Sequence, residues 1–316
     1  MKLAVVIPAF NEEATIGDVI RLIPRNVVED VKIIVVDDGS TDNTVNEAWK
    51  AGADKVVSFK RNMGLAYAFK KGLEAALEMN ADIIVNIDAD GQYDPREIPQ
   101  LIKPIVEGKA DIVLGSRFKG SIEYMPKRKK WGNILATKIV SFLAGIPISD
   151  AQTGFRAFSR EAALKLNILS DYTYVQETVI QAAYKGLRII EVPCTFKKRK
   201  AGESRLISSL LSYAKKSGLT ILRTYINYKP LRTFLLIGGA LSLIGVIIGL
   251  RVLIHFLLTG MVSPHIPSAI LTAILVIVGF QIIMLGLIAD MIGMERKLME
   301  EILYRLKKEY LHADGN

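Results

Sequence analysis

Two long uncharged apolar runs in the last third of the chain limit its fold more than any other feature. Residues 233–250 contain no charged side chain, and the run continues past Arg251 to Leu258. Residues 266–289 form a second uncharged run. At about 1.5 Å per residue, helices of this length can cross roughly 30 Å of hydrocarbon. We therefore expect a transmembrane helical hairpin at about 233–258 and 266–291, in preference to two buried helices of a soluble core.

The charges that flank the two runs indicate how the hairpin is oriented. Lys and Arg precede the first run and follow the second, whereas the connector 259–265 has neither. Loops rich in Lys and Arg stay in the cytoplasm. We therefore expect both termini and the domain before the hairpin to be cytoplasmic, at the plasma membrane of a prokaryote. Arg232 is expected to pair with Asp290, and the first apolar run, Leu3–Ala9, does not resemble a secretory signal.

The net charge of +9 is concentrated in one segment. Residues 197–232 contain ten Lys or Arg and one acid, Glu203, and therefore account for the whole excess. Within this segment, residues 206–229 place apolar side chains at helical spacing with cations between them. We expect one or two amphipathic helices on the inner membrane surface, broken at Gly218, with a soluble packed helix as the alternative. The tail, 293–316, is expected to form a cytoplasmic helix.

Alternating apolar strands and amphipathic helices are predicted for the first domain, residues 1–205. The strands are expected at 3–7, 32–36, 55–58, 82–87 and 111–114, with helices at 13–23, 41–51 and 64–79. Strands with nearly continuous apolar character are typical of a sheet that is covered on both faces. The pattern predicts a doubly wound α/β domain whose ligand crevice lies at the carboxyl ends of the strands.

Polar clusters follow several of these strands. Asp37-Asp38 follow the second strand, Asp88-Ala89-Asp90 follow the fourth, and Arg117 follows the fifth. Carboxylates gathered in one crevice repel one another unless a cation lies between them, and oxygen ligands suit Mg²⁺ or Mn²⁺. A lone Asp-x-Asp is as often a turn as a site. Its position in this crevice, beside Arg117, favours a divalent-metal site.

Several common site types are absent from the sequence. The single cysteine, Cys194, excludes an internal disulfide and a cysteine-cluster metal site. There is no GxxxxGK[ST] loop, and Pro8-Ala9-Phe10 follow the first strand where a dinucleotide-binding GxGxxG would stand. These absences argue against a P-loop NTPase and against a dinucleotide-dependent oxidoreductase.

The motifs VVIPAFNE (5–12), VVDDGSTD (35–42) and DADGQ (88–92) resemble glycosyltransferase family 2. DAQTGFR (150–156) and the hairpin resemble its polyprenyl-phosphate branch, the dolichyl-phosphate mannose synthase-like enzymes. The resemblance implies a GT-A fold and inverting, metal-dependent transfer of a single sugar to a membrane polyprenyl or dolichyl phosphate. Mannose from GDP-mannose is favoured. Processive members carry Gln-x-x-Arg-Trp, whereas this chain has Gln176-Glu177-Thr178-Val179-Ile180.

Two alternatives to mannosyl transfer remain open. The first is a UDP-sugar-dependent transferase, for glucose or another sugar, acting on the same class of lipid. The second, of another class, is a catalytically inactive membrane-tethered nucleotide-binding scaffold. The expected partners are the nucleotide sugar, the lipid phosphate and the bilayer. No nucleic acid is expected, and an oligomer is possible.

The same resemblance implies roles for individual residues. The nucleotide sugar is matched to Pro8, Phe10, Glu12, Val36, Asp38, Asp88, Ala89, Asp90, Arg117, Arg199, Ser204 and Arg205, and the metal to Asp90 and Gln92. The lipid phosphate is matched to Arg117, Arg128, Lys129 and Arg199, although the four cations 127–130 leave open which one meets it. For residues 197–200, a plain membrane-facing charge run is the alternative.

Three carboxylates are the catalytic candidates that this resemblance implies. Asp150 matches an orienting carboxylate or base, and Asp88 and Glu177 are the further candidates. A turn or cap acid beside Ser149 is the alternative for Asp150.

Overall fold

The computed structural model describes residues 1–170, 174–199 and 210–313, so the predicted donor-binding residues Ser204 and Arg205 lie outside the described residues. Contacts divide the chain into two units, each described here by itself. The first contains Met1–Thr224 and Leu303–Asn316, and the second contains Tyr225–Ile302.

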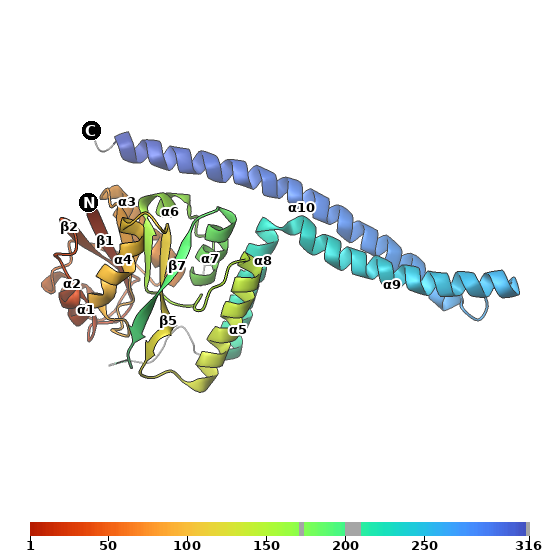
Figure 1. The fold of residues 1–316 in the computed structure, drawn as a ribbon, viewed down its shortest axis with the longest axis horizontal. Coiled ribbons are helices and arrows are strands. Elements are labelled where there is room, and N and C mark those ends of the chain that lie inside the picture. Colours follow the sequence, from red (N-terminus) through yellow and green to blue (C-terminus); the bar gives the residue numbers. More distant parts are fainter. Residues whose placement is uncertain (171–173, 200–209, 314–316) are drawn as a thin grey trace. The chain divides into compact units, whose positions relative to one another are not determined.

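A seven-stranded sheet forms the centre of the first unit (Figure 1). The strands are β1 (Lys2–Ala9), β2 (Asp30–Asp37), β3 (Lys55–Ser58), β4 (Ile83–Asn86), β5 (Ile112–Ile122), β6 (Arg156–Ser159) and β7 (Ile189–Phe196). Their order is β3-β2-β1-β4-β6-β5-β7, and only β6 runs antiparallel to its neighbours. The five predicted strands are confirmed. The short strand β6 and the more exposed β7 were not predicted.

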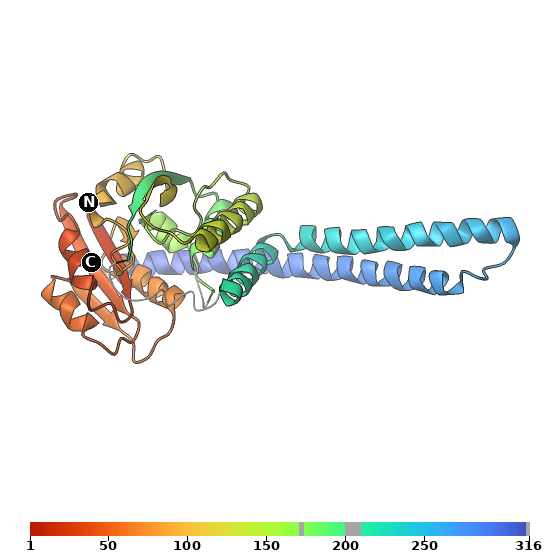
Figure 2. The same cartoon turned by 90° about the horizontal axis from the view of Figure 1, so that it is seen from below.

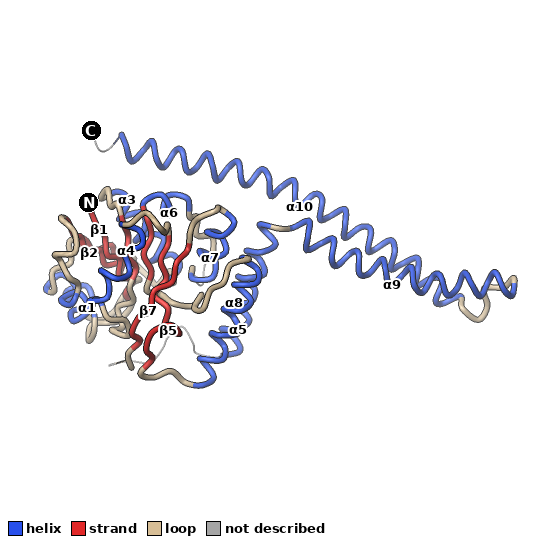
Figure 3. Tube along the Cα trace, viewed as in Figure 1, coloured by secondary structure: helices blue, strands red, loops and turns tan. Residues whose placement is uncertain are grey.

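Helices cover both faces of this sheet (Figure 3). In the first unit they are α1 (Ile16–Leu22), α2 (Thr44–Lys50), α3 (Leu65–Glu78), the short 3-10 helix η1 (Pro95–Glu97), α4 (Ile98–Val106), α5 (Lys127–Ala144), α6 (Arg160–Lys165), α7 (Val175–Tyr184) and most of α8 (Leu210–Tyr228). The three predicted helices correspond to α1, α2 and α3. The α/β class was therefore predictable, whereas the helices from α4 to α7 were not.

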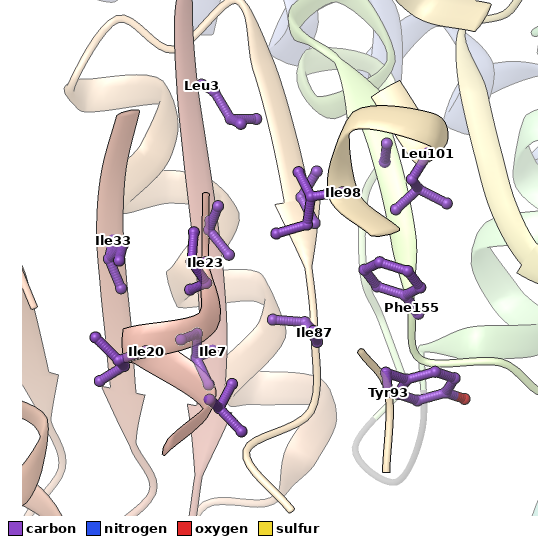
Figure 4. Packing of buried hydrophobic residues seen from close by; sticks show 14 of the residues in the cluster. Leu3, Ile7, Ile20, Ile23, Ile33, Ile87, Tyr93, Ile98, Leu101 and Phe155 are labelled. Carbon is purple, nitrogen blue, oxygen red and sulfur yellow. The ribbon is translucent and has the colours of Figure 1, made fainter. Parts of the chain in front are cut away.

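Alternation along β1 divides the buried side chains between the two faces. Leu3 and Ile7 pack in one cluster with Ile20 of α1 and Leu101 of α4 (Figure 4). On the other face α3 lies close to the sheet, because Gly72 has no side chain: a Cβ there would lie 2.2 Å from Val6 Cγ1. Burial of β1 and β2 on both faces explains their nearly continuous apolar sequences.

The second unit is dominated by α9 (Pro230–Thr259) and the first part of α10 (Ile266–Ala313), which run antiparallel side by side (Figures 1 and 2). Within the described residues these are the two helices long and apolar enough to cross a membrane. Small residues let the backbones approach closely. A Cβ on Gly238 would lie 2.5 Å from the carbonyl oxygen of Gly279, and one on Gly249 would lie 2.7 Å from Thr272 Cγ2.

The structure corrects one expectation about the segments next to the hairpin and refines another. α8 runs without interruption through Gly218, so the predicted break there is wrong. The expected tail helix is continuous with the second apolar helix, because α10 extends to Ala313. Arg232 and Asp290 line one pocket together with Tyr228 and Lys229, which places the two residues expected to pair at the same end of the hairpin.

Candidate active site

The carboxyl ends of β1, β2 and β4 meet at the point where the order of the sheet reverses. The chain passes from β1 to β2 on one side and later returns to β4 on the other side of β1. Parallel α/β sheets bind their ligands at such a switch point. Of the predicted donor-binding residues, Pro8, Phe10 and Glu12 lie at the end of β1, and Val36 and Asp38 lie at the end of β2. Asp88, Ala89 and Asp90 follow β4.

Asp38 holds the loop that precedes α3. Its carboxylate accepts hydrogen bonds from the backbone N–H groups of Met63 (2.6 Å) and Gly64 (3.0 Å). Burial raises the pKa of Asp38, and these two amide bonds oppose the rise. The adjacent Gly39, with φ of 76°, lets this loop approach closely, because a Cβ would lie 2.5 Å from the carbonyl carbon of Arg61. Asp38 and Gly39 therefore shape one wall of the crevice.

Asp88 and Asp90 form a half-buried acid pair in the crevice. Burial, followed by the charge of Asp90, raises the pKa of Asp88 to about 7. Burial also raises the pKa of Asp90, although Asp90 Oδ1 accepts a hydrogen bond from the Gln92 N–H at 3.0 Å. The pair therefore concentrates negative charge where little water can screen it. A ligand that brings positive charge would relieve this cost.

The donor set of this pair fits a divalent cation that is held mainly by its substrate. Within the described ranges, no three His, Cys, Asp or Glu side chains gather as a metal-binding group. Asp90 and the amide of Gln92 supply hard oxygen atoms, and the Gln92 Nε2–H donates to the carbonyl of Lys197 at 3.3 Å. Mg²⁺ commonly binds through one or two carboxylates, water and substrate phosphates. Asp90 and Gln92 are suited to such an ion.

Three cations face the acid pair. Arg199 donates from Nη2 to Glu12 Oε1, and its Nη1 lies 3.8 Å from Asp90 Oδ2. Burial and Arg117 lower the pKa of Lys129, whereas Asp90 and Asp88 raise it. Lys129 is half-buried, while Lys127, Arg128 and Lys130 are exposed. The structure therefore separates Lys129 from the other cations of the 127–130 run, a distinction that the sequence left open.

Arg117 is the third cation, and Asp150 fixes its orientation. The guanidinium donates from Nε to Asp150 Oδ2 at 2.7 Å and from Nη2 to Oδ1 at 2.8 Å. The backbone N–H of Arg117 also donates to Oδ2, at 3.0 Å. Both side chains are buried, with exposed fractions of 4% and 0%. This geometry matches the orienting role among the two roles expected for Asp150.

Glu177 lies in a different environment from Asp150. Its two carboxylate oxygens accept hydrogen bonds from the backbone N–H groups of Leu169 (3.1 Å) and Ser170 (3.0 Å). Gln181 Nε2 donates to the same carboxylate at 3.1 Å. Glu177 therefore holds the segment before α7, and its catalytic role stays an untested prediction.

The loop 150–155 brings Gly154 against the acid pair. A Cβ on Gly154 would lie 2.5 Å from Asp88 Oδ2, so only glycine leaves room for the carboxylate. The loop is fixed by Arg156, the last residue of the 150–156 motif, and by Asn86 and Tyr93, which the sequence motifs did not include. Asn86 Nδ2 donates to the Gly154 carbonyl at 2.9 Å, and the Gly154 N–H donates to the Tyr93 hydroxyl at 3.2 Å. Arg156, fully buried, donates to the carbonyls of Ala151 and Thr153.

Comparison with known proteins gives a family match and named relatives. Residues 4–166 match the family model described as glycosyl transferase family 2. The chain is 37% identical to the UDP-N-acetylglucosamine–dolichyl-phosphate N-acetylglucosaminyltransferase of Methanococcus voltae, over 60% of this chain and 82% of that protein. It is 31% identical to the polyprenol monophosphomannose synthase of Mycolicibacterium smegmatis, over 65% of this chain and 81% of that protein.

A solved structure resembles this chain over most of its length. Glucosyl-3-phosphoglycerate synthase from Mycobacterium tuberculosis, crystallised with Mn²⁺, UDP and phosphoglyceric acid, superposes with a TM-score of 0.55 and 26% identity. The match covers 71% of this chain and 78% of that chain.

Proposed function

Because this chain belongs to glycosyl transferase family 2, we propose that it moves one sugar from a nucleotide-diphosphate donor to a membrane polyprenyl or dolichyl phosphate. Relatives named for dolichyl-phosphate and polyprenol-phosphate sugar transfer support this acceptor class. The observation that carries the proposal is the acid pair Asp88 and Asp90, faced by Lys129, Arg117 and Arg199 at the switch point. The membrane-spanning hairpin is consistent with an acceptor that cannot leave the bilayer.

The donor diphosphate would lie between the acid pair and the cations. We infer that Asp90 and Gln92 hold a divalent ion, Mg²⁺ or Mn²⁺, as the Mn²⁺ and UDP in the related synthase support. When bound, such an ion offsets the negative charge that builds on the departing diphosphate. Asp88, wedged against Gly154, lies beside Asp90 and is placed to contact the donor sugar or its phosphate. The end of β1, with Phe10 and Glu12, and the loop held by Asp38 would enclose the nucleoside.

The lipid phosphate acceptor supplies the attacking oxygen and also carries negative charge. A lipid monophosphate carries about −1.5 to −2 charge at neutral pH, so it needs compensating cations more than a strong base. Lys129 and the oriented guanidinium of Arg117 supply fixed positive charge on that side of the crevice. A phosphate oxygen of the acceptor forms the new bond to the anomeric carbon as the bond to the donor diphosphate breaks, which inverts that carbon. Asp150 then acts as a positioning residue through Arg117.

Mannose from GDP-mannose remains our first proposal for the donor, and a UDP-sugar is the second. The polyprenol monophosphomannose synthase of Mycolicibacterium smegmatis supports the first candidate. The UDP-linked name of the Methanococcus voltae relative and the UDP bound to the related synthase support the second. We further propose that the first unit and both termini face the cytoplasm, because the Lys and Arg residues flank the hairpin on that side.

Transfer of label from a radioactive donor to polyprenyl phosphate tests the proposal. The full chain, reconstituted in vesicles with Mg²⁺ or Mn²⁺, is offered GDP-mannose, UDP-glucose and UDP-N-acetylglucosamine in parallel. We expect one donor to give a product that extracts into organic solvent, and Asp90→Ala to abolish its formation. Gly91→Ala is not a suitable control, because Gly91 has φ of 70° and an alanine there would strain the backbone next to Asp90. Lys130→Ala, which changes an exposed cation of the same run, is the matched control and should retain most activity. Absence of lipid product with all three donors would contradict the proposal.

A further inference from the structure

Glu191 of β7 is an acidic side chain that lies almost out of reach of water. Its side chain is 4% exposed. A carboxylate in such a place needs hydrogen-bond donors around it, because burial removes its hydration. The donors come mainly from one turn of the chain: Glu191 Oε1 accepts from the backbone N–H groups of Ser149 and Asp150, each at 2.9 Å. Glu191 therefore holds the turn that carries Asp150.

The Ser149 hydroxyl adds to this contact. It donates toward both carboxylate oxygens of Glu191, at 3.0 Å each. Because a hydroxyl has a single hydrogen, Ser149 is the acceptor in its contact with the Ser116 hydroxyl, at 2.7 Å. Lys119 Nζ lies 2.9 Å from Glu191 Oε2, but the Lys119 side chain is 50% exposed, so this ion pair contributes little. The main hold of Glu191 is on the 149–150 turn.

This turn connects Glu191 to the guanidinium of Arg117. Glu191 fixes the backbone of Asp150, and the carboxylate of Asp150 accepts two hydrogen bonds from the Arg117 guanidinium. Ser116, next to Arg117 on β5, is tied to the same turn through Ser149. A shift of the 149–150 peptide away from Glu191 would therefore move the carboxylate that orients Arg117.

The contact requires a carboxylate at position 191. Hydrogen bonds to a charged acceptor are shorter and about twice as strong as those to a neutral one. Glutamine would keep one acceptor oxygen, but its NH₂ group would face the N–H and O–H donors of the turn. A buried donor left without a partner costs about 1–3 kcal/mol. The turn can recover that cost only by moving.

We propose that Glu191 is a positioning residue, which holds the 149–150 peptide and, through Asp150, sets the direction of the Arg117 guanidinium. This role rests on the proposed function, in which Arg117 faces the lipid phosphate. Glu191 acts on the reaction only through Asp150 and Arg117. A change at Glu191 should therefore weaken use of the acceptor more than use of the donor.

Glu97 provides a matched control further along β7. Its carboxylate also accepts from one backbone N–H and one hydroxyl, since the Thr195 N–H donates at 2.9 Å and Thr195 Oγ1 at 2.7 Å. Glu97→Gln thus weakens a contact of the same kind on the same strand, but leaves the 149–150 turn in place. Both Glu191→Gln and Glu97→Gln should unfold at lower urea concentration than the native chain.

Transfer kinetics of the full chain in vesicles separate positioning from stability. For Glu191→Gln we expect the KM for polyprenyl phosphate to rise about tenfold, because a misplaced cation binds the phosphate less well. The KM for the nucleotide sugar should change by less than about twofold. Glu97→Gln should leave both KM values unchanged. In the Asp150→Asn chain, Glu191→Gln should add no further loss, because its effect passes through that carboxylate.

Modification of arginine by phenylglyoxal, read by peptide mass spectrometry, gives a measurement that needs no catalysis. Arg117 is 4% exposed in the native chain, so it should react slowly. Glu191→Gln should raise its reaction rate several-fold, whereas Glu97→Gln should not. Ser149→Ala removes only the hydroxyl contact and should raise the rate less. This variant keeps the test available if Glu191→Gln does not fold.

Three results would overturn the proposal. They are equal reactivity of Arg117 in the native and Glu191→Gln chains, an unchanged KM for polyprenyl phosphate in Glu191→Gln, and a further loss from Glu191→Gln in the Asp150→Asn chain. If the native chain transfers no sugar to lipid, the proposed function fails instead. The reactivity of Arg117 still decides in that case whether Glu191 orients it.

Discussion

Replacing Asp150 by asparagine tests the orienting role assigned to this carboxylate. The change keeps the shape of the side chain but removes its charge. The Arg117 guanidinium would stay buried, 4% exposed, without a counter-charge. The side-chain nitrogen of Asn at position 150 would also face the N–H groups of the guanidinium. Breaking a buried ion pair by removing one partner costs about 3–5 kcal/mol. Since domains have about 5–15 kcal/mol of stability, the variant should fold but be clearly weaker.

Urea unfolding followed by tryptophan fluorescence measures this loss, because Trp49 and Trp131 both lie in the first unit. The double-mutant cycle adds Arg117→Met and the combined variant. If the pair interacts as the geometry shows, the loss from Asp150→Asn should be much smaller in the Arg117→Met chain. A coupling energy below about 0.5 kcal/mol would refute the reasoning.

The same four proteins separate a positioning residue from a base. If Asp150 acts only through Arg117, Asp150→Asn should lower transfer in the native chain and add nothing in the Arg117→Met chain. A base would behave differently, because its loss should reduce the rate further in either background and alter the acidic limb of the pH–rate profile. A further loss in the Arg117→Met chain would therefore return Asp150 to the role of base.

Three other changes have expected outcomes. Gly154→Ala should lower the transfer rate about a hundredfold with the fold retained, because its Cβ, 2.5 Å from Asp88 Oδ2, must displace the carboxylate by about 1 Å; circular dichroism checks the fold. Gly39→Ala should cost about 2–3 kcal/mol in urea unfolding, from its φ of 76° and the clash with the Arg61 backbone. The hydrogen bond from Arg188 lowers the pKa of Asp111, so its stabilisation is present at neutral pH and is lost progressively as the pH falls from about 3.9 through the lowered pKa; Asp111→Asn should therefore weaken the protein at pH 7, and by progressively less as the pH is lowered below about 3.9.

The parts of the fold that were predictable from sequence are those with local patterns. Continuous apolar runs predicted β1, β2 and β4, because strands covered on both faces have no polar side. The hairpin was predictable from the length of two uncharged runs. By contrast, β6 has only four residues, and it forms because β4 and β5 flank it, which no local pattern indicates.

The acidic residues of the candidate site were predictable from sequence, whereas most of the residues that hold its loops in place were not. The Asp-x-Asp after β4 could be read from its position at a strand end. Arg117, which was expected to follow the fifth strand, lies within β5, because that strand continues to Ile122. Asn86, a polar residue that ends an otherwise apolar strand, was a signal that could have been used. Tyr93 gave none, since its hydroxyl meets the backbone of Gly154, about 60 residues away in the sequence. Arg156 was visible as the last residue of the 150–156 motif, whereas its bonds to the Ala151 and Thr153 carbonyls were not. Lys129 could not be separated from its neighbours without the direction of α5.

The reversed direction of β6 decides which part of the chain can reach the reacting groups. β6 pairs Arg156 with Asn86 at the carboxyl end of β4, so its first residue lies where its neighbour finishes. If β6 ran parallel to β4, the loop before β6 would lie at the amino end of β4, away from Asp88. The backward strand instead presents the residues that precede it, and Gly154 among them touches Asp88. Under the proposed function, lengthening or shortening the segment before β6 would change the space beside Asp88 while the pairing of β6 with β4 and β5 is kept, which offers natural or designed variation a route to new sugar preferences.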